Sequence, residues 1–411
     1  MNKNLKNLLM LLICFSILCG CTNTTSSKKN YDPAANETVT KAEREIAINI
    51  MNNMGSKSKG FNAEDYLDTE QGKWVLKHFK HYFASKTDVG YNQASQENYE
   101  YWSNIGMKKE YFPGDDVVKE WSVFTPKNIK KGIKYPVVFV MHAGGSNILM
   151  AENMGFVEDA AENGYIVVCP SWANENMTSI QEKAFLDSGM KYYEAYAFKT
   201  IYEKVQKLYN IDNTKVYCAG FSGGGNASAY VAIECPELIA GTSPATGAAI
   251  QTTTKDDLLS MSKYGMPMMM VFGEYDAEER WPITHDAVEL GPVSTPQTLE
   301  ERIDNVNAWH TSCGAIKENV TIDSVRKTAN SSDNSASTLF GLKFDKEFIK
   351  KDFETTFSFG DLYNKDGNAI VRYMFIESCP HFIAPNWAKE VYSFFSHYSR
   401  DSKTNKIIFT K

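Results

Sequence analysis

The sequence predicts an α/β protein with a mostly parallel sheet that helices cover on both faces. Three runs, 135–141, 165–169 and 215–219, are almost wholly apolar, as buried central strands are. Segments with a helical pattern separate and follow these runs, and such alternation predicts parallel strand pairing. The expected helices are 147–162, 178–209 and 224–234, and further strands are expected at 120–124, 266–272 and 370–376.

The C-terminal third of the chain carries three further features. Asp366-Gly367 lies between two strand-like runs and predicts a hairpin turn. Residues 384–399 form an amphipathic pattern that predicts a terminal helix. The polar stretch 293–344 is interpreted as an insertion before the last strands, and its position suggests a lid over a functional site.

The N-terminus has the pattern of an export signal. Lys3 and Lys6 precede the apolar run 8–18, which is too short for a stable membrane span. The sequence Leu18-Cys19-Gly20-Cys21 resembles a bacterial lipobox. We therefore expect a signal peptide at 1–20, lipidation of Cys21 and a polar tether over 21–38, which would anchor the protein at the cell membrane on its extracellular or periplasmic side. The alternative is an ordinary signal peptide that is cut elsewhere.

The rest of the chain divides at about residue 119. Residues 39–118 read as a helical extension without a chemical motif, and 119–411 as one α/β domain. The formal net charge of −7 comes without a basic block, so nucleic acid is not expected as a partner. Cysteines left after export divide into two groups. We expect Cys169 and Cys218 in the core, and a disulfide bond, which export permits, among Cys235, Cys313 and Cys379.

The strongest chemical signal is Gly220-Phe221-Ser222-Gly223-Gly224, placed between an expected strand and an expected helix. Small residues on both sides allow a sharp strand-to-helix turn that exposes the Ser222 hydroxyl. The amide of Gly223, at the start of the helix, would face the negative charge that develops on an attacked carbonyl. The pentapeptide alone is a weak signal, but its position predicts Ser222 as a nucleophile.

A second glycine-containing loop follows the strand 135–141. It reads His142-Ala143-Gly144-Gly145, and a His-Gly-Gly loop at this position supplies oxyanion-hole amides in lipases and esterases. Ala143 stands where a glycine is common. Ala143 and Gly144 both remain candidate donors beside Gly223.

The remaining candidates are a carboxylate and an imidazole later in the chain. Asp276 follows the strand 266–272 and is the chosen acid, which would orient the imidazole. The chain order serine, acid, histidine requires a base late in the chain, and His381 is chosen because it follows the strand 370–376 on a loop that opens into the final helix. The rival acids are Glu274, Glu278 and Asp286, and the rival bases are His285, His310 and His397. His78 and His81 lie three residues apart on an expected helix, but without further ligands they are interpreted as a solvated pair.

These motifs resemble the extracellular polyhydroxybutyrate depolymerases and the feruloyl and acetylxylan esterases. The resemblance begins at Tyr209-Asn210-Ile211-Asp212, continues through the Ser222 motif, and includes Asn163-Gly164-Tyr165, Ala308-Trp309 with Cys313-Gly314, and Phe394-Phe395 after His381. It spans about 119–400 and implies an α/β-hydrolase fold, ester hydrolysis without a cofactor or metal, and Ser222, Asp276 and His381 as the triad. Ala143 and the enlarged 293–344 region depart from the family pattern.

Three functions compete. The first is a surface serine esterase that acts on a small-molecule or polysaccharide-linked ester. The second is a peptidase of prolyl-oligopeptidase type, although the N-terminal segment is too short for the propeller that such enzymes carry. The third is a non-catalytic binding lipoprotein on a hydrolase scaffold, which would bind ligands without turnover.

Overall fold

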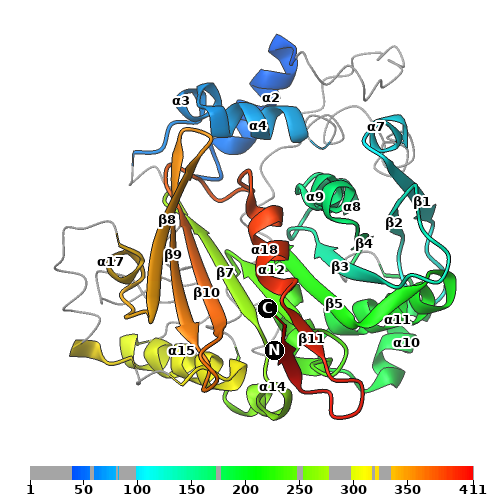
Figure 1. The fold of residues 1–411 in the computed structure, drawn as a ribbon. Helices are drawn as coiled ribbons and strands as arrows, with labels where there is room; N and C mark the ends of the chain where they lie inside the picture. The colour runs from blue at the N-terminus through cyan, green and yellow to red at the C-terminus, as the bar shows by residue number, and fades with distance from the viewer. Residues whose placement is uncertain are drawn as a thin grey trace, which may run out of the picture.

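The computed structural model describes residues 39–55, 60–79, 82, 99–172, 177–247, 253–276, 298–316, 320–323 and 335–410. At its centre is a ten-stranded sheet in the order β1-β2-β4-β3-β5-β6-β7-β10-β9-β8 (Figure 1). Its strands are β1 Met107–Phe112, β2 Trp121–Pro126, β3 Tyr135–Met141, β4 Ile166–Pro170, β5 Ile211–Phe221, β6 Gly241–Ala245, β7 Met268–Gly273, β8 Lys346–Asp352, β9 Thr355–Tyr363 and β10 Ala369–Ile376. A small separate pair consists of β11 Tyr398–Arg400 and β12 Ile407–Phe409.

The middle of the sheet is parallel, from β4 through β3, β5, β6 and β7 to β10. Antiparallel pairs flank it on both sides, β1 with β2 and β9 with β8. The apolar run 137–141 of β3 is fully buried, as its composition predicts. Because all parallel strands end at one edge, the residues that follow β3, β4, β5, β7 and β10 meet there. The predicted fold class is confirmed.

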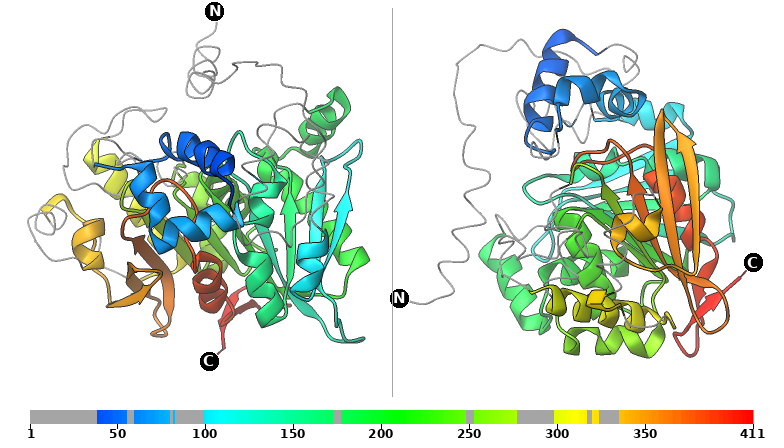
Figure 2. Two further views of the ribbon diagram at one scale, coloured as in Figure 1. Left: turned by 90° about the horizontal axis from the view of Figure 1, so that it is seen from above. Right: turned by 90° about the vertical axis from the view of Figure 1, so that its left-hand side faces the viewer.

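Helices cover both faces of the sheet (Figure 2). On one face α9 and α18 contact each other, with the Trp387 ring packed edge-on against Phe156. On the other, α10, α11, α12, α14 and α15 form a contiguous group. The helices after β3 are α8 Ile148–Glu152, α9 Phe156–Asn163, α10 Ser179–Ser188, α11 Tyr193–Leu208, α12 Gly223–Glu234, α14 Leu259–Tyr264 after the 3-10 turn η3 Asp256–Leu258, α15 Leu299–Cys313, α17 Ala336–Phe340 and α18 Trp387–Phe395.

Three expected helices differ from those observed. The helix expected at 147–162 is divided into α8 and α9 by Gly155, which has φ +88°. Gly189, with φ +71°, ends α10 before α11 begins, so 178–209 is also two helices. Glycine adopts this backbone conformation without the steric cost of a Cβ, and it therefore ends a helix. The terminal helix stops at Phe395 because β11 follows. The hairpin turn at Asp366-Gly367 is confirmed.

The N-terminal part of the described chain contains α2 Lys41–Met51, α3 Ala63–Asp68, α4 Glu70–His78 and α7 Tyr99–Asn104. In Figure 1 the blue helices α2 to α4 lie above the edge at which β7 and β10 end. The extension expected at 39–118 is not wholly helical, because 107–112 is strand β1 and joins the main sheet. The signal peptide, Cys21 and the tether lie outside the described residues.

A buried ion pair joins β1 to α8. Lys109 Nζ lies 2.8 Å from Glu152 Oε2, and both side chains have no exposed surface. The Ser122 hydroxyl donates to the other Glu152 oxygen at 2.7 Å. Burial lowers the pKa of Lys109, while the Glu152 charge opposes that shift. The pair therefore fixes α8, which follows the His142 loop, against the antiparallel end of the sheet.

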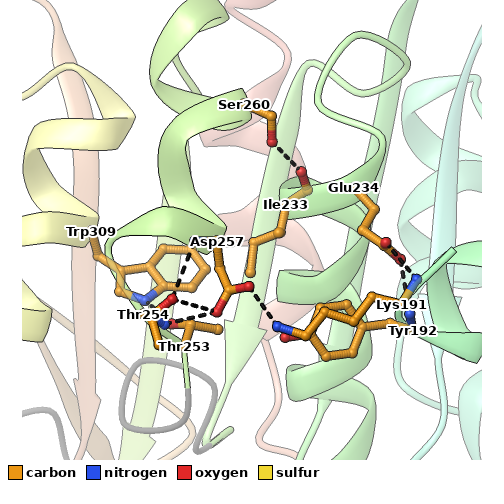
Figure 3. Close-up of polar contacts among 9 residues, drawn as sticks. All are labelled: Lys191, Tyr192, Ile233, Glu234, Thr253, Thr254, Asp257, Ser260 and Trp309. Carbon is orange, nitrogen blue, oxygen red and sulfur yellow. Dashed lines mark hydrogen bonds and ion pairs between the residues drawn. The ribbon is translucent and has the colours of Figure 1, made fainter.

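The far end of α12 is also anchored. The Glu234 carboxylate accepts the backbone N–H groups of Lys191 and Tyr192, at 2.7 and 3.0 Å, and so holds the start of α11. Ser260 Oγ donates to Ile233 O at 2.6 Å, which joins α14 to the same end (Figure 3). These contacts hold α12 in place behind Ser222.

The expected disulfide bond among Cys235, Cys313 and Cys379 is absent from the described residues. All three thiols are free and buried, as are those of Cys169 and Cys218, which were expected in the core. The three lie on different elements: Cys235 ends α12, Cys313 ends α15, and Cys379 follows β10. Each packs as a small apolar side chain instead. Among the described helices, none has the length and apolarity that crossing a membrane requires.

Replacing Lys109 with methionine leaves Glu152 as a buried carboxylate without its cation. We expect Lys109→Met to lower the free energy of unfolding by about 3–5 kcal/mol, measured by urea denaturation at neutral pH. The double variant Lys109→Met with Glu152→Gln removes both charges and is expected to recover most of the loss. A double variant no more stable than the single one would contradict this account.

Candidate active site

Ser222 lies on a strained turn between β5 and α12. Its backbone has φ 56° and ψ −116°, a conformation that L-residues rarely adopt. The Ser222 amide donates to Ala245 O on β6 at 2.9 Å, which holds the turn. The first hydrogen bond of α12 runs from Asn226 N to Ser222 O, so the Gly223 amide precedes the intrahelical bonds. The sequence therefore folds here into a tight strand-to-helix turn that carries the half-buried Ser222.

Glycines permit this turn because backbone segments approach one another closely. A Cβ on Gly220 would lie 2.0 Å from Gly224 O, and one on Gly224 would lie 2.1 Å from Met141 O at the end of β3. On Gly223 a Cβ would lie 2.6 Å from Gly144 N. Any larger residue would push these segments apart. The glycines thus bring the start of α12 against the loop after β3.

The structure brings Ser222, His381 and Asp276 into one hydrogen-bonded chain. His381 Nε2 lies 2.9 Å from Ser222 Oγ, and His381 Nδ1 lies 2.5 Å from Asp276 Oδ1. Because an ionised carboxylate only accepts, we assign the proton to Nδ1, which leaves Nε2 to accept the Ser222 hydroxyl proton. Asp276 is fully buried and its Oδ2 also accepts the Gly273 N–H at 3.2 Å.

Backbone contacts join the loop that carries Asp276 to the loop that carries His381. Glu274 N donates to Ile376 O at 3.0 Å, and Tyr275 N donates to Cys379 O at 2.8 Å. The Glu274 carboxylate, a rival acid in the sequence, accepts Ser378 N at 2.7 Å. It therefore braces the histidine loop, and it is Asp276 that contacts the imidazole.

The loop after β3 lies beside the turn that carries Ser222. His142 is buried, and its Nδ1–H donates to Ala143 O at 2.8 Å. Gly144 is adjacent to Gly223, because a Cβ on Gly223 would lie 2.6 Å from Gly144 N. The candidate amides therefore lie at one end of α12, where partial positive charge accumulates.

Trp172, two residues after β4, contacts both the His142 loop and the start of α12. The sequence did not indicate this residue. Its Nε1–H donates to His142 O at 2.9 Å, and the two rings stack with centroids 5.1 Å apart. A Cβ on Gly223 would lie 3.2 Å from the edge of the indole. The one available signal was position, because Trp172 follows a buried parallel strand at the edge where Ser222 was expected.

The other candidates lie elsewhere. His310 Nε2 contacts the Tyr373 hydroxyl at 2.8 Å within the core, and His397, beyond α18, contacts Thr410 O. His78, expected to be solvated, is instead largely buried, with its side chain 15% exposed, its ring stacked on Trp74 and its Nδ1 in contact with Trp74 O. Among the described residues no cluster suits a metal ion. Only part of the suggested lid 293–344 lies within the described residues. In that part, Cys313 O at the end of α15 accepts the Met266 N–H, which lies at the opposite edge of the sheet from Ser222. Glu278, Asp286, His285 and His81 lie outside the described residues.

This arrangement suits nucleophilic attack on a carbonyl. A hydroxyl hydrogen-bonded to an oriented imidazole can be deprotonated as it attacks, and nearby amides can stabilise the oxyanion. Strand order, the turn after β5 and the order Ser222, Asp276, His381 are those of the α/β-hydrolase fold, which this chain has.

Comparison with known families agrees with this fold. Residues 122–288 match the model of the dienelactone hydrolase family. The matched segment contains Ser222 and Asp276 and ends before His381. No curated protein matches the chain.

Several solved esterase structures are similar to parts of the chain. A ferulic acid esterase is 14% identical over 50% of this chain and 85% of its own, with a TM-score of 0.35. A thermostable esterase is 23% identical over 41% of this chain, with a TM-score of 0.31, and the alignment spans 46% of that esterase. Est1E from Butyrivibrio proteoclasticus is 16% identical over 41% of this chain and 78% of its own, with a TM-score of 0.31.

Adding a methyl group at Gly223 tests the close approach of the two loops. We expect Gly223→Ala to displace Gly144 and to slow the reaction of Ser222 with a fluorophosphonate probe by about a hundredfold, the typical effect of losing one oxyanion donor. Tyr230→Phe in the same helix, where the ring stacks on Tyr192, serves as the control. Labelling of Gly223→Ala at the control's rate would show that the approach is unimportant.

Proposed function

We propose that the protein is a serine esterase that hydrolyses carboxylic esters through an acyl-enzyme on Ser222. The observation that carries the proposal is the hydrogen-bonded chain from Ser222 Oγ through His381 to the buried Asp276 carboxylate. The match to the dienelactone hydrolase family model supports the hydrolase class. Ester substrates, small or linked to polysaccharide, follow from the sequence resemblance.

The reaction proceeds in two halves. Ser222 Oγ attacks the acyl carbon while His381 Nε2 takes the hydroxyl proton. The resulting oxyanion is stabilised by the Gly223 amide and by the amide of Ala143 or Gly144. His381 then returns the proton to the departing alcohol as the bond from the acyl carbon to the alcohol oxygen breaks. Water, deprotonated by the same Nε2, then attacks the acyl carbon. His381 returns this proton to Ser222 Oγ as the bond from the acyl carbon to Oγ breaks and the acid leaves.

Asp276 acts on the imidazole rather than on the substrate. Its carboxylate accepts the Nδ1 proton, which keeps Nε2 free to accept, and stabilises the imidazolium that forms in each half-reaction. When His381 is protonated at low pH, Nε2 cannot accept the Ser222 proton. Activity is therefore expected to fall as the pH decreases.

Substitutions that change a single polar group of Ser222 or Asp276 test the proposal. Ser222→Ala is expected to abolish hydrolysis of p-nitrophenyl acetate and labelling by a fluorophosphonate. Asp276→Asn is expected to lower kcat by about 10⁴-fold, because the amide favours the wrong tautomer. Feruloyl esters and amino-acyl anilides, tested in parallel, distinguish esterase from peptidase activity. Equal labelling of wild type and Ser222→Ala would exclude Ser222 as the nucleophile, and binding without turnover over the panel would favour a binding protein.

We further propose that the protein is anchored at the outer face of the cell membrane by lipid on Cys21. The proposal is based on the lipobox-like sequence that ends at Cys21. Cys21→Ser is expected to abolish incorporation of radiolabelled palmitate and to move the protein from the membrane fraction. Undiminished incorporation in the variant would exclude this site, and Cys19→Ser serves as the matched control.

A further inference from the structure

The N-terminal segment 39–79, without 56–59, contacts the loop that carries His381. We call this segment the N-terminal clamp; it contains α2, α3 and α4. Figure 2 shows its helices, in blue, lying across one edge of the sheet. Ser222 and Asp276 follow β5 and β7, which end at this edge. The clamp precedes the segment matched by the family model, so its role is separate from that match.

The most direct contact is made to His381 itself. The His381 backbone N–H donates to Met54 O at 2.5 Å, across 327 positions of sequence. Residues of the α/β domain hold the preceding part of the loop, through Tyr275 N to Cys379 O and Ser378 N to Glu274. At His381, by contrast, the acceptor is Met54 O, which belongs to the clamp. The position of the His381 backbone therefore depends on a residue that is far from it in the sequence.

A second contact holds the beginning of the same loop. Gln71 is 1% exposed, and its Nε2 donates to Glu377 O at 3.2 Å. Its Oε1 accepts the Tyr66 hydroxyl proton at 3.1 Å, which orients the amide. Glu377 O also accepts from Thr355 Oγ1 at 2.6 Å, so clamp and sheet bind this carbonyl together.

Aromatic rings add further contacts between the clamp and the loops that carry His381 and Asp276. Phe79 packs edge-on against Phe382, with centroids 4.8 Å apart, next to His381. On the acid side, Phe61 contacts Tyr275 at 5.3 Å, next to Asp276. These contacts put the clamp against both loops of the proposed triad. A shift of the clamp would change the separation of Ser222 and His381.

We propose that the N-terminal clamp is a positioning element that sets His381 at hydrogen-bonding distance from Ser222, with Gln71 and the Met54 carbonyl as its contact points. This inference rests on the proposed esterase function. Catalysis requires the imidazole to stay aligned, and a displacement of about 1 Å can lower the rate a hundredfold. The clamp residues touch no reacting atom and act through the loop 377–382.

Two polar side chains of the clamp provide a matched pair of variants. Gln71 donates to the histidine loop, whereas Arg44 on α2 donates to Glu64 O and to the Asp68 carboxylate within the clamp. Gln71→Met keeps the length and volume of the side chain but cannot donate to Glu377 O. Arg44→Met removes hydrogen bonds between α2 and α3 and leaves the contacts to that loop in place.

We expect Gln71→Met to lower kcat for p-nitrophenyl acetate by at least about tenfold with little change in KM, and to slow fluorophosphonate labelling by a similar factor. Arg44→Met is expected to keep the wild-type kcat, and the Tm of both variants is measured beside it. Selective ¹⁵N-histidine labelling gives an independent readout. The signals of His381 Nδ1–H and its backbone amide are expected to move in Gln71→Met and to stay in Arg44→Met.

A wild-type kcat in Gln71→Met, or an equal loss of kcat in Arg44→Met, would overturn the positioning role. If Gln71→Met does not fold, Tyr66→Phe removes one oxygen from the same contact and is expected to lower kcat by a few-fold; an unchanged kcat then counts against the proposal. A different result would contradict the proposed esterase function itself: a wild-type protein that neither hydrolyses esters nor reacts with the fluorophosphonate.

Discussion

The site depends on one imidazole that is held between a buried carboxylate and a hydroxyl on a strained turn. His381 binds Asp276 through Nδ1 and Ser222 through Nε2, so small movements of any of the three loops break one of these bonds. The positive φ of Ser222 persists because the surrounding backbone determines it, with Ala245 O, Gly220 and Gly224 packed around the turn. The strain is local, and the core supports it.

The core supports the site by fixing the edge of the sheet where its strands end. Gly273 shows how tight this edge is, because a Cβ there would lie 2.5 Å from Cys379 O. The buried pair of Lys109 and Glu152 fixes α8 on one side of the His142 loop, and Trp172 supports that loop from the other. The His142 loop is thereby held by the strands, by α8 and by the Trp172 ring, whereas surface loops are generally more mobile.

The N-terminal clamp extends this support beyond the α/β domain. Most of its buried residues pack as an ordinary helical layer, among them Leu67 and Val75. Gln71 differs because a buried amide must find partners, and it finds them in Tyr66 and in the loop that carries His381. The buried Gln71 amide thus favours one position of the N-terminal clamp relative to the α/β domain.

The sequence by itself determined the fold class and named the three residues that converge. Apolar strands alternating with helices predict a parallel sheet, and the positions of Asp276 and His381 after two of the predicted strands pointed to them as acid and base. The structure decided between Asp276 and Glu274, because only the first contacts the imidazole while the second binds Ser378 N. Tertiary structure alone decided what depends on contacts between distant segments. Trp172, Met54 and Gln71 carry no motif, β1 joins the sheet by pairing with β2, and Cys235, Cys313 and Cys379 lie unpaired on separate elements. Local pattern specifies elements and turns, whereas proximity in space arises only when the elements pack.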